Sequence, residues 1–255
     1  MGVLNVTPDS FSDGGRWEGV DAAVGQAARM IADGAQVIDV GGESTRPGAD
    51  PVDEATEHRR VIPVIEQMRD RWPDMEISVD TMKPAVARAA VTAGATIIND
   101  VTASLEAVAA EMGVGWIAMH AGGPSKTMQI DPRYDDVVAE VAAFLEDAVA
   151  RAKARGIERV WVDPGIGFGK TIPHNLELIA NFDRFSRIAP SVLAVSRKKS
   201  IGDLHAVSDG VDAVPADDRL EGSVTMATWG VHLGADLVRV HDVRATVHAV
   251  RMVAS

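Results

Sequence analysis

QVIDVGG (36–42) is a short apolar run that carries a carboxylate and ends in glycine, and its form is repeated along the chain. Seven other apolar runs close on a polar residue in a similar way: GVLNV (2–6), EISVD (76–80), TIIND (96–100), WIAMH (116–120), VWVDPG (160–165), SVLAVS (191–196) and DLVRVHD (236–242). Between them lie segments with apolar residues at helical spacing, such as 21–34, 84–94, 135–156 and 220–234. This alternation predicts a single-domain α/β fold, a (β/α)8 TIM barrel with its active site at the C-terminal ends of the strands.

The length of the chain agrees with that fold. Its 255 residues match the typical size of one such barrel, roughly 250 residues, so we expect one domain over 1–255 and no linker. The runs are rich in Val and Ile, as expected of strands buried on both faces of a parallel sheet. The least regular piece is 202–218, which we interpret as an exposed loop or an irregular helix after the seventh strand.

Composition and charge narrow the classes of function. No stretch approaches the ~20 apolar residues that span a bilayer, and the first residues lack the layout of a signal peptide. The absence of cysteine excludes a disulfide framework and a thiolate nucleophile. The net charge of -12 argues against a nucleic-acid surface, which needs a basic face. We therefore expect a cytoplasmic protein that acts on small molecules and binds neither nucleic acid nor membrane.

Polar residues stand at nearly every strand end, where a barrel places its active site. An isolated Asp in such a position is equally well explained as a cap of the next helix. A core built only for stability would not gather so many ionisable groups there, because unpaired buried charge is costly. The candidates are Asn5, Asp39, Asp80, Asn99, Asp100, His120, Asp163, Ser196, Arg197, Lys198, Arg239 and His241.

Two loops after the first strands have the composition of ligand-binding turns. NVTPDSFSDGG (5–15) carries Phe11, an apolar side chain that either packs beneath the loop or covers a ligand. GGESTRPGAD (41–50) combines flexible glycines with the fixed φ of Pro47 and the permanent charge of Arg46. An arginine presented in this way suits an anion.

Asp80, Asn99 and Asp163 end three different strands that converge on the barrel mouth. Such a trio can bind either a hard cation or the donor-rich edge of a heterocycle, because an ionised carboxylate accepts paired hydrogen bonds. The glycine-rich stretch GIGFGKT (165–171) is not a P-loop, since position 164 is Pro and position 170 is Lys where the phosphate-binding templates require Gly.

A cationic cluster follows the last two strands. SRKK (196–199) brings three cations to one turn, and Arg239 and His241 end the eighth strand. Barrels often bind phosphate with the loops after strands 7 and 8, so we expect an anion site here. The alternative is a solvated charged face, which placement at a strand end makes less favourable.

The residues in these positions resemble those of dihydropteroate synthases. NVTPDSFSDGG, DVGGESTRPGA, SVDT, NDV, MH, DPGIGFGK, SRKKSIG and RVHDV stand in the order found in that family, from Met1 to about residue 251. The resemblance implies a transferase of folate biosynthesis and a sulfonamide target. It would condense 6-hydroxymethyl-7,8-dihydropterin diphosphate with p-aminobenzoate to give 7,8-dihydropteroate and diphosphate.

The resemblance also assigns roles to individual residues. It gives the pterin pocket Asp80, Asn99, Asp163 and Lys198. It gives the diphosphate Asn5, Arg239 and His241, with Asn5 also a ligand of Mg2+, the implied cofactor. It gives the aminobenzoate site Phe11, Thr45, Arg46, Pro47, Phe168, Lys198 and Ser200. Asp39 and Met119 support the pocket from below, and the residues expected to be catalytic are Arg46, Asp80, Asp163 and Lys198.

The implied chemistry needs these residue types. Breaking the C–O bond leaves positive charge that the dihydropterin ring delocalises, while Mg2+, Arg239 and His241 neutralise the departing diphosphate. An aromatic amine is unprotonated at neutral pH, so no strong general base is required. Lys199, which follows the Ser-Arg-Lys turn, is expected to tune the aminobenzoate carboxylate site.

Alternatives remain open from the sequence. One is a pterin-binding paralogue without synthase activity, and another is a methyltransferase that passes a folate methyl group to a corrinoid partner. The family resemblance further implies a homodimer through outer helices. Apolar candidates for that contact are Trp229, Val231, Val247 and Val250, whose other interpretation is ordinary packing on the barrel.

Overall fold

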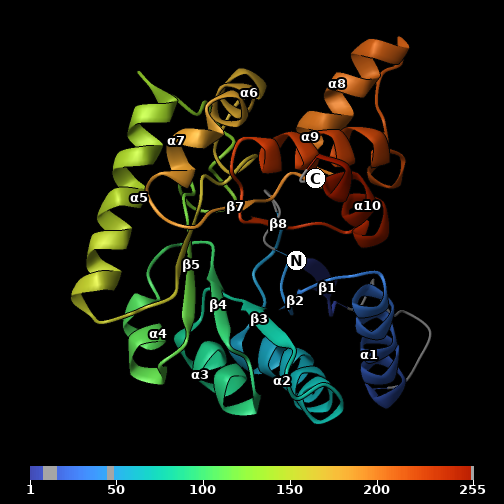
Figure 1. The fold of residues 1–255 in the computed structure, drawn as a ribbon, viewed down its shortest axis with the longest axis vertical. Coiled ribbons are helices and arrows are strands. Elements are labelled where there is room, and N and C mark those ends of the chain that lie inside the picture. The colour runs from blue at the N-terminus through green and yellow to red at the C-terminus, as the bar shows by residue number, and fades with distance from the viewer. Residues whose placement is uncertain (8–15, 45–48, 254–255) are drawn as a thin grey trace.

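The computed structural model describes residues 1–7, 16–44 and 49–253. Strands and helices alternate along them (Figure 1). The strands are β1 (Gly2–Asn5), β2 (Val37–Gly41), β3 (Glu76–Asp80), β4 (Ile97–Asp100), β5 (Gly115–Met119), β6 (Val160–Asp163), β7 (Val192–Leu193) and β8 (Leu237–Val238). The helices are α1 (Arg16–Ala32), α2 (Glu54–Arg71), α3 (Pro84–Ala93), α4 (Glu106–Met112), α5 (Val137–Ala154), α6 (Ile172–Ala180), α7 (Phe182–Ser186), α8 (Lys199–Asp209), η2 (Ala216–Asp218, a 3-10 turn), α9 (Leu220–His232) and α10 (Val243–Val253).

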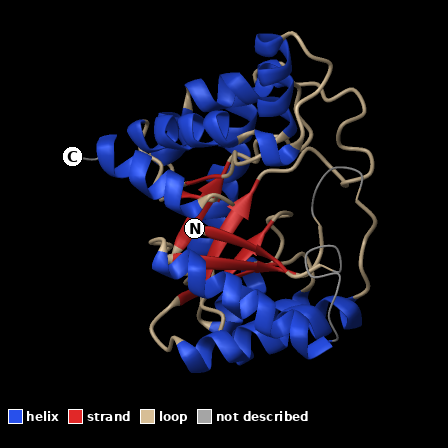
Figure 2. Ribbon diagram, turned by 90° about the vertical axis from the view of Figure 1, so that its right-hand side faces the viewer, coloured by secondary structure: helices blue, strands red, loops and turns tan. Residues whose placement is uncertain are grey.

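The strands form a parallel ring, which confirms the predicted barrel. β1 to β6 pair in sequence order, and β7 pairs with β8. Single bridges complete the ring: Val162 pairs with Ser191 between β6 and β7, and Gly2 pairs with Val240 between β8 and β1. Helices lie outside the strands on both sides (Figure 2). Every predicted strand is present, although the regular ladders of β7 and β8 are shorter than their apolar runs.

The prediction for 202–218 was partly wrong. Its first half belongs to α8, a regular helix over Lys199–Asp209, and only Ala216–Asp218 forms a 3-10 turn. Ile201 and Ala206 of α8 are buried, and this anchoring stabilises the helix although the segment is rich in Asp and Gly. Two helices, α6 and α7, also stand between β6 and β7, where the sequence predicted one.

Strand alternation separates an apolar floor from a polar upper layer inside the barrel. Val37, Ile97 and Ile117 belong to one buried cluster, against which Trp161 and Leu237 also pack. Side chains two residues apart share one face of a strand. The same interior face therefore carries, one layer higher, the residues Asp39, Asn99, Met119, Asp163 and Arg239.

Asp100, a candidate from its place at a strand end, serves the fold. Its side chain is fully buried, and Oδ2 accepts hydrogen bonds from Ser104 N and Leu105 N at 2.6 Å and from Trp116 Nε1 at 3.2 Å. Oδ1 accepts from Thr102 N at 3.0 Å. Asp100 thus holds the turn that precedes α4, although the N-cap of that helix is Leu105 and not Asp100.

Within the described ranges, none of the helices has the length and apolar character needed to cross a membrane.

Replacement of Asp100 by Asn should lower the free energy of unfolding by about 2 kcal/mol, because the amide presents N–H groups to buried donors. Urea denaturation followed by circular dichroism measures this change. Asp209→Asn, an exposed change at the end of α8, is the matched control. Equal stability of the two variants would contradict the structural role of Asp100.

Candidate functional site

Arg239 joins three strands at the barrel mouth. Its Nε donates to Asp39 Oδ2 at 2.6 Å and its Nη2 to Asp80 Oδ2 at 2.8 Å. Asn99 Nδ2 donates to the same Asp39 oxygen at 3.1 Å. Asp39 Oδ1 and Asp80 Oδ1 are buried and have no partner among the described residues. Because buried polar atoms are normally satisfied, these two oxygens are acceptors ready for a ligand.

Two carboxylates sharing one guanidinium have unusual electrostatics. Burial raises the pKa of Asp80 to about 7, with Arg239 opposing this shift and the Asp39 carboxylate adding to it. Burial likewise raises the pKa of Asp163, against the hydrogen bond from Gly165 and the nearby cations. Such shifts are typical of functional sites, although ion-pair networks that serve only structure produce them too.

Asn5 lies beside this group at the end of β1. Gly41 pairs in register with Asn5 on one side and with Asp80 on the other. A Cβ at Gly41 would lie 3.8 Å from both Asn5 Oδ1 and Asp80 Oδ2. The sheet register therefore brings an amide oxygen and a carboxylate oxygen to neighbouring positions.

The loop after β6 contributes an aromatic face. The ring of Phe168 lies under the ammonium of Lys198, whose Nζ is 4.1 Å from the ring centroid. Met119, at the end of β5, packs in one buried cluster with Phe168. Cation and ring attract one another, so the end of β7 and the loop after β6 form one wall of the site.

The turns after β7 and β8 are bonded to each other. Ser196 Oγ lies 3.0 Å from His241 Nδ1 and accepts a bond from His241 N at 3.2 Å. Arg197 forms two bonds to Asp242, Nε to Oδ2 at 3.0 Å and Nη2 to Oδ1 at 2.6 Å. Arg197 has a φ of 58°, which is uncommon for a residue with a side chain. These contacts hold the cationic cluster in a defined shape.

The structure places most of the predicted residues together. Asn5, Asp80, Asn99, Met119, Asp163, Phe168, Lys198, Arg239 and His241 lie at the strand ends or in the turns that follow them, and Ser200 lies in the first turn of α8. Phe11, Thr45, Arg46 and Pro47 lie outside the described residues. Lys199 is 84% exposed and pairs with Asp203 at 2.7 Å, which gives no support to its expected role at the aminobenzoate site.

Asp39, which was expected to support the pocket from below, forms an ion pair with Arg239 at the barrel mouth. Its direct ion pair with Arg239 spans 200 positions of the chain, so no local pattern signals it. A cluster of charged residues next to the loop after β2 was not predicted from the sequence. There Lys83 Nζ donates to Glu57 Oε2 at 2.5 Å and also contacts Glu43.

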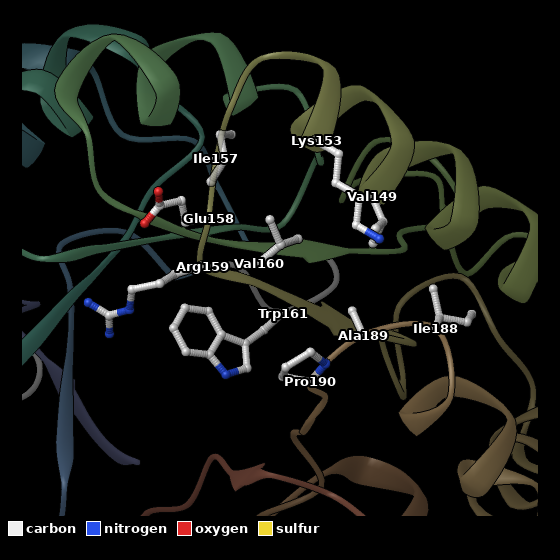
Figure 3. A pocket seen from close by; sticks show the side chains of 10 residues that line it. All are labelled: Val149, Lys153, Ile157, Glu158, Arg159, Val160, Trp161, Ile188, Ala189 and Pro190. Atoms are coloured by element: carbon white, nitrogen blue, oxygen red, sulfur yellow. The ribbon is translucent and has the colours of Figure 1, made fainter.

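A separate pocket of about 400 Å3 lies at the opposite end of the barrel (Figure 3). Lys153, Arg159, Trp161 and Pro190 are among its lining residues, which stand before or at the start of β6 and β7. None of the predicted site residues lines it. Active sites of barrels form at the other end of the strands, so this pocket is not the candidate site.

Comparison with known proteins agrees with this site. Residues 1–241 match the family of pterin binding enzymes. The dihydropteroate synthase of Escherichia coli K12 is 46% identical over 261 aligned residues, which cover 99% of the chain and 89% of that protein.

Two solved structures extend the comparison. The Yersinia pestis dihydropteroate synthase with a sulfonamide drug has a TM-score of 0.91 and 41% identity, covering 100% of this chain and 92% of that one. The Xanthomonas albilineans dihydropteroate synthase with 7,8-dihydropteroate has a TM-score of 0.85 and 40% identity, with 99% and 90% covered.

Asp80 should make stability depend on pH. Its pKa is about 7 in the folded protein and about 3.9 in an unfolded chain, so the folded state binds more protons between these values. Its contribution to stability is therefore lost as pH rises from 4 to 7. The unfolding free energy of the wild type should fall relative to that of Asp80→Asn over this range, by up to about 4 kcal/mol.

Urea denaturation at several pH values measures the difference between the two proteins. Parallel pH profiles for the wild type and Asp80→Asn would contradict the raised pKa of this carboxyl.

Proposed function

The chain belongs to the family of pterin-binding enzymes, and we infer that its activity is that of a dihydropteroate synthase. It condenses 6-hydroxymethyl-7,8-dihydropterin diphosphate with p-aminobenzoate and releases diphosphate. The observation that carries this function is the buried, unpartnered Oδ1 of Asp80, set on the same interior face as Asn99 and Asp163. The sequence left two interpretations open for these three residues, a hard cation or the edge of a heterocycle, and we favour the heterocycle.

The pterin is held by its donor-rich edge. Ionised Asp80 and Asp163 accept hydrogen bonds from its amino and ring N–H groups, and Asn99 offers both a donor and an acceptor. Lys198, held over the Phe168 ring, lies beside the same pocket. Hydrogen bonds of this kind replace the water that surrounds a free carboxylate, so binding relieves the cost of burying Asp80 and Asp163.

The departing diphosphate is neutralised by the cations at β7 and β8. Arg239 uses Nε and Nη2 for Asp39 and Asp80. We infer that its remaining nitrogen, Nη1, binds the leaving group. The contact with Ser196 fixes the ring of His241. Preorganised charge that meets negative charge as it develops is the largest catalytic effect expected here, because the amine needs no strong base.

The residues at the mouth fit a magnesium ion. Asn5 offers an amide oxygen, and Asp39 Oδ1 is a buried acceptor without a partner among the described residues. No group of three His, Cys, Asp or Glu side chains suited to a metal is found within these residues. Magnesium commonly rests on one or two protein oxygens, waters and substrate phosphates, which agrees with Asn5 as the ligand. When bound, the ion stabilises charge on the diphosphate.

The aminobenzoate site and the assembly are part of the same proposal. The proposed residues of this site are Phe168, whose ring lies under Lys198, and Ser200 in the first turn of α8. The resemblance adds Phe11, Thr45, Arg46 and Pro47, which lie outside the described residues. The homodimer and the cytoplasmic location stay predictions. Trp229 on α9 is 49% exposed, which suits a contact between subunits, whereas Val247 packs against the barrel core.

The purified protein should release diphosphate from the pterin diphosphate only when p-aminobenzoate and Mg2+ are both present. Lys198→Ala should lower kcat/KM by about 100-fold or more, because a cation is lost from the reacting centre. Lys153→Ala, an exposed change at the other end of the barrel, is the control and should leave the rate unchanged.

A coupled diphosphate assay measures both rates. Pterin binding without any turnover would instead favour the non-catalytic paralogue.

Chelation by EDTA should abolish diphosphate release, and added Mg2+ should restore it. Asn5→Ala should raise the Mg2+ concentration needed for half-maximal rate by about tenfold, since an oxygen ligand is lost. Titration of the rate with Mg2+ gives this value. An unchanged Mg2+ requirement in Asn5→Ala would remove Asn5 from the metal site.

A further inference from the structure

Lys170 is a buried cation that the mechanism above does not use. It follows the glycine-rich loop after β6 and is 3% exposed. Its Nζ donates to Gly165 O and to Phe168 O at 3.0 Å each and lies 2.9 Å from His120 Nδ1. An ammonium has three N–H groups, which these three acceptors can use in full, and His120 O lies farther away, at 3.4 Å from Nζ.

His120 is suited to act as the third acceptor. Burial, together with the charge of Lys170, lowers the pKa of His120 to about 3, so its ring is neutral at physiological pH. A neutral imidazole has one nitrogen that accepts a hydrogen bond. The ring is held edge-on against Phe144, with centroids 5.0 Å apart. His120 therefore offers a fixed acceptor to Lys170.

The glycines give the loop the shape that Lys170 requires. Gly165, Gly167 and Gly169 have φ values of 67°, 82° and 66°. A Cβ at Gly165 would lie 1.9 Å from His120 O, so no other residue fits there. The loop thus presses against the end of β5 and presents two of its carbonyl oxygens to one buried ammonium.

The same loop carries two groups of the pterin site. Gly165 N donates to Asp163 Oδ1 at 2.7 Å, while Gly165 O accepts from Lys170. Phe168 O also accepts from Lys170, and its ring supports Lys198. A single residue, Gly165, therefore lies between Lys170 and Asp163, and a single residue, Phe168, lies between Lys170 and Lys198.

We propose that Lys170 is a positioning residue of the pterin site, whose ammonium fixes the loop after β6 and whose positive charge favours the ionised form of Asp163. This inference rests on the proposed function, because it concerns how the pterin is held. A buried ammonium is costly when a neutral side chain could fill the space. Because Lys170 supports the loop that contacts both Asp163 and Lys198, a role in the site explains why the chain keeps a buried ammonium here.

The charges around Asp163 determine the sign of the expected effect. Burial raises the pKa of Asp163, while the Gly165 N–H, Lys198, Arg239 and Lys170 lower it. Burial lowers the pKa of Lys170 itself to about 7, with Asp163 opposing and Lys198 adding to this shift. Below pH 7 the ammonium is charged, so removing it should raise the pKa of Asp163 in that range.

The test is the pH dependence of pterin diphosphate binding, measured by isothermal titration calorimetry at constant Mg2+ without p-aminobenzoate. Lys170→Met should bind the pterin more weakly, and its affinity should fall off on the acid side at a higher pH than that of the wild type. Lys170→Arg, which keeps the charge, should retain the wild-type fall-off. Asp80 is present in all of these proteins, so a difference between them in the pH at which affinity falls off reports on position 170.

Two further variants complete the design. Lys153→Met makes the same change at an exposed lysine and should match the wild type. Lys170→Gln keeps two N–H donors without the charge, and it replaces Lys170→Met in the experiment if that variant does not fold.

Three other outcomes would contradict either the role of Lys170 or the proposed function. A weaker affinity with an unshifted acid fall-off in the neutral variants would reduce Lys170 to a space-filling role. If Lys170→Arg folds but Lys170→Met and Lys170→Gln do not, the positive charge at this position is needed for folding and the proposal is wrong. Absence of pterin binding by the wild-type protein would overturn the proposed function instead.

Discussion

The pair of ion pairs from Arg239 to Asp39 and Asp80 is the interaction on which the site depends. It links the last strand of the barrel to the second and third across the mouth. The guanidinium bonds to one oxygen of each Asp, and the other oxygen of each stays buried without a partner among the described residues. The barrel mouth therefore contains two carboxylates whose hydrogen bonding is completed only when a ligand binds.

That arrangement has an energetic consequence. Burial disfavours the charge of Asp80 and the neighbouring Asp39 carboxylate repels it, which is why the pKa of Asp80 rises to about 7 although Arg239 opposes the shift. A ligand that donates hydrogen bonds stabilises the charged form. The apolar floor beneath, formed by Val37, Ile97 and Ile117, excludes water from below and strengthens these interactions.

Local charge at the site opposes the charge of the whole protein. The chain carries a net charge of -12, yet Lys170, Lys198 and Arg239 gather at one end of the barrel. Each is held by specific contacts: carbonyl oxygens around Lys170, an aromatic ring under Lys198 and carboxylates around Arg239. An acidic protein can therefore hold the cations that bind a diphosphate, because short-range contacts dominate over distant, screened charges.

The sequence by itself determined the barrel, its strand ends and its family. These depend on local patterns: apolar runs have the length of buried strands, helical spacing separates them, and polar residues end each run, as at Asp80 and Asp163. Tertiary structure alone decided which of the polar residues do what. Asp100 proved to hold a turn, whereas Asp39 proved to pair with Arg239, 200 positions away. The role of Lys170 likewise depends on His120, 50 positions earlier. Such contacts arise when the barrel closes, and no periodicity in the chain records which distant side chains then meet.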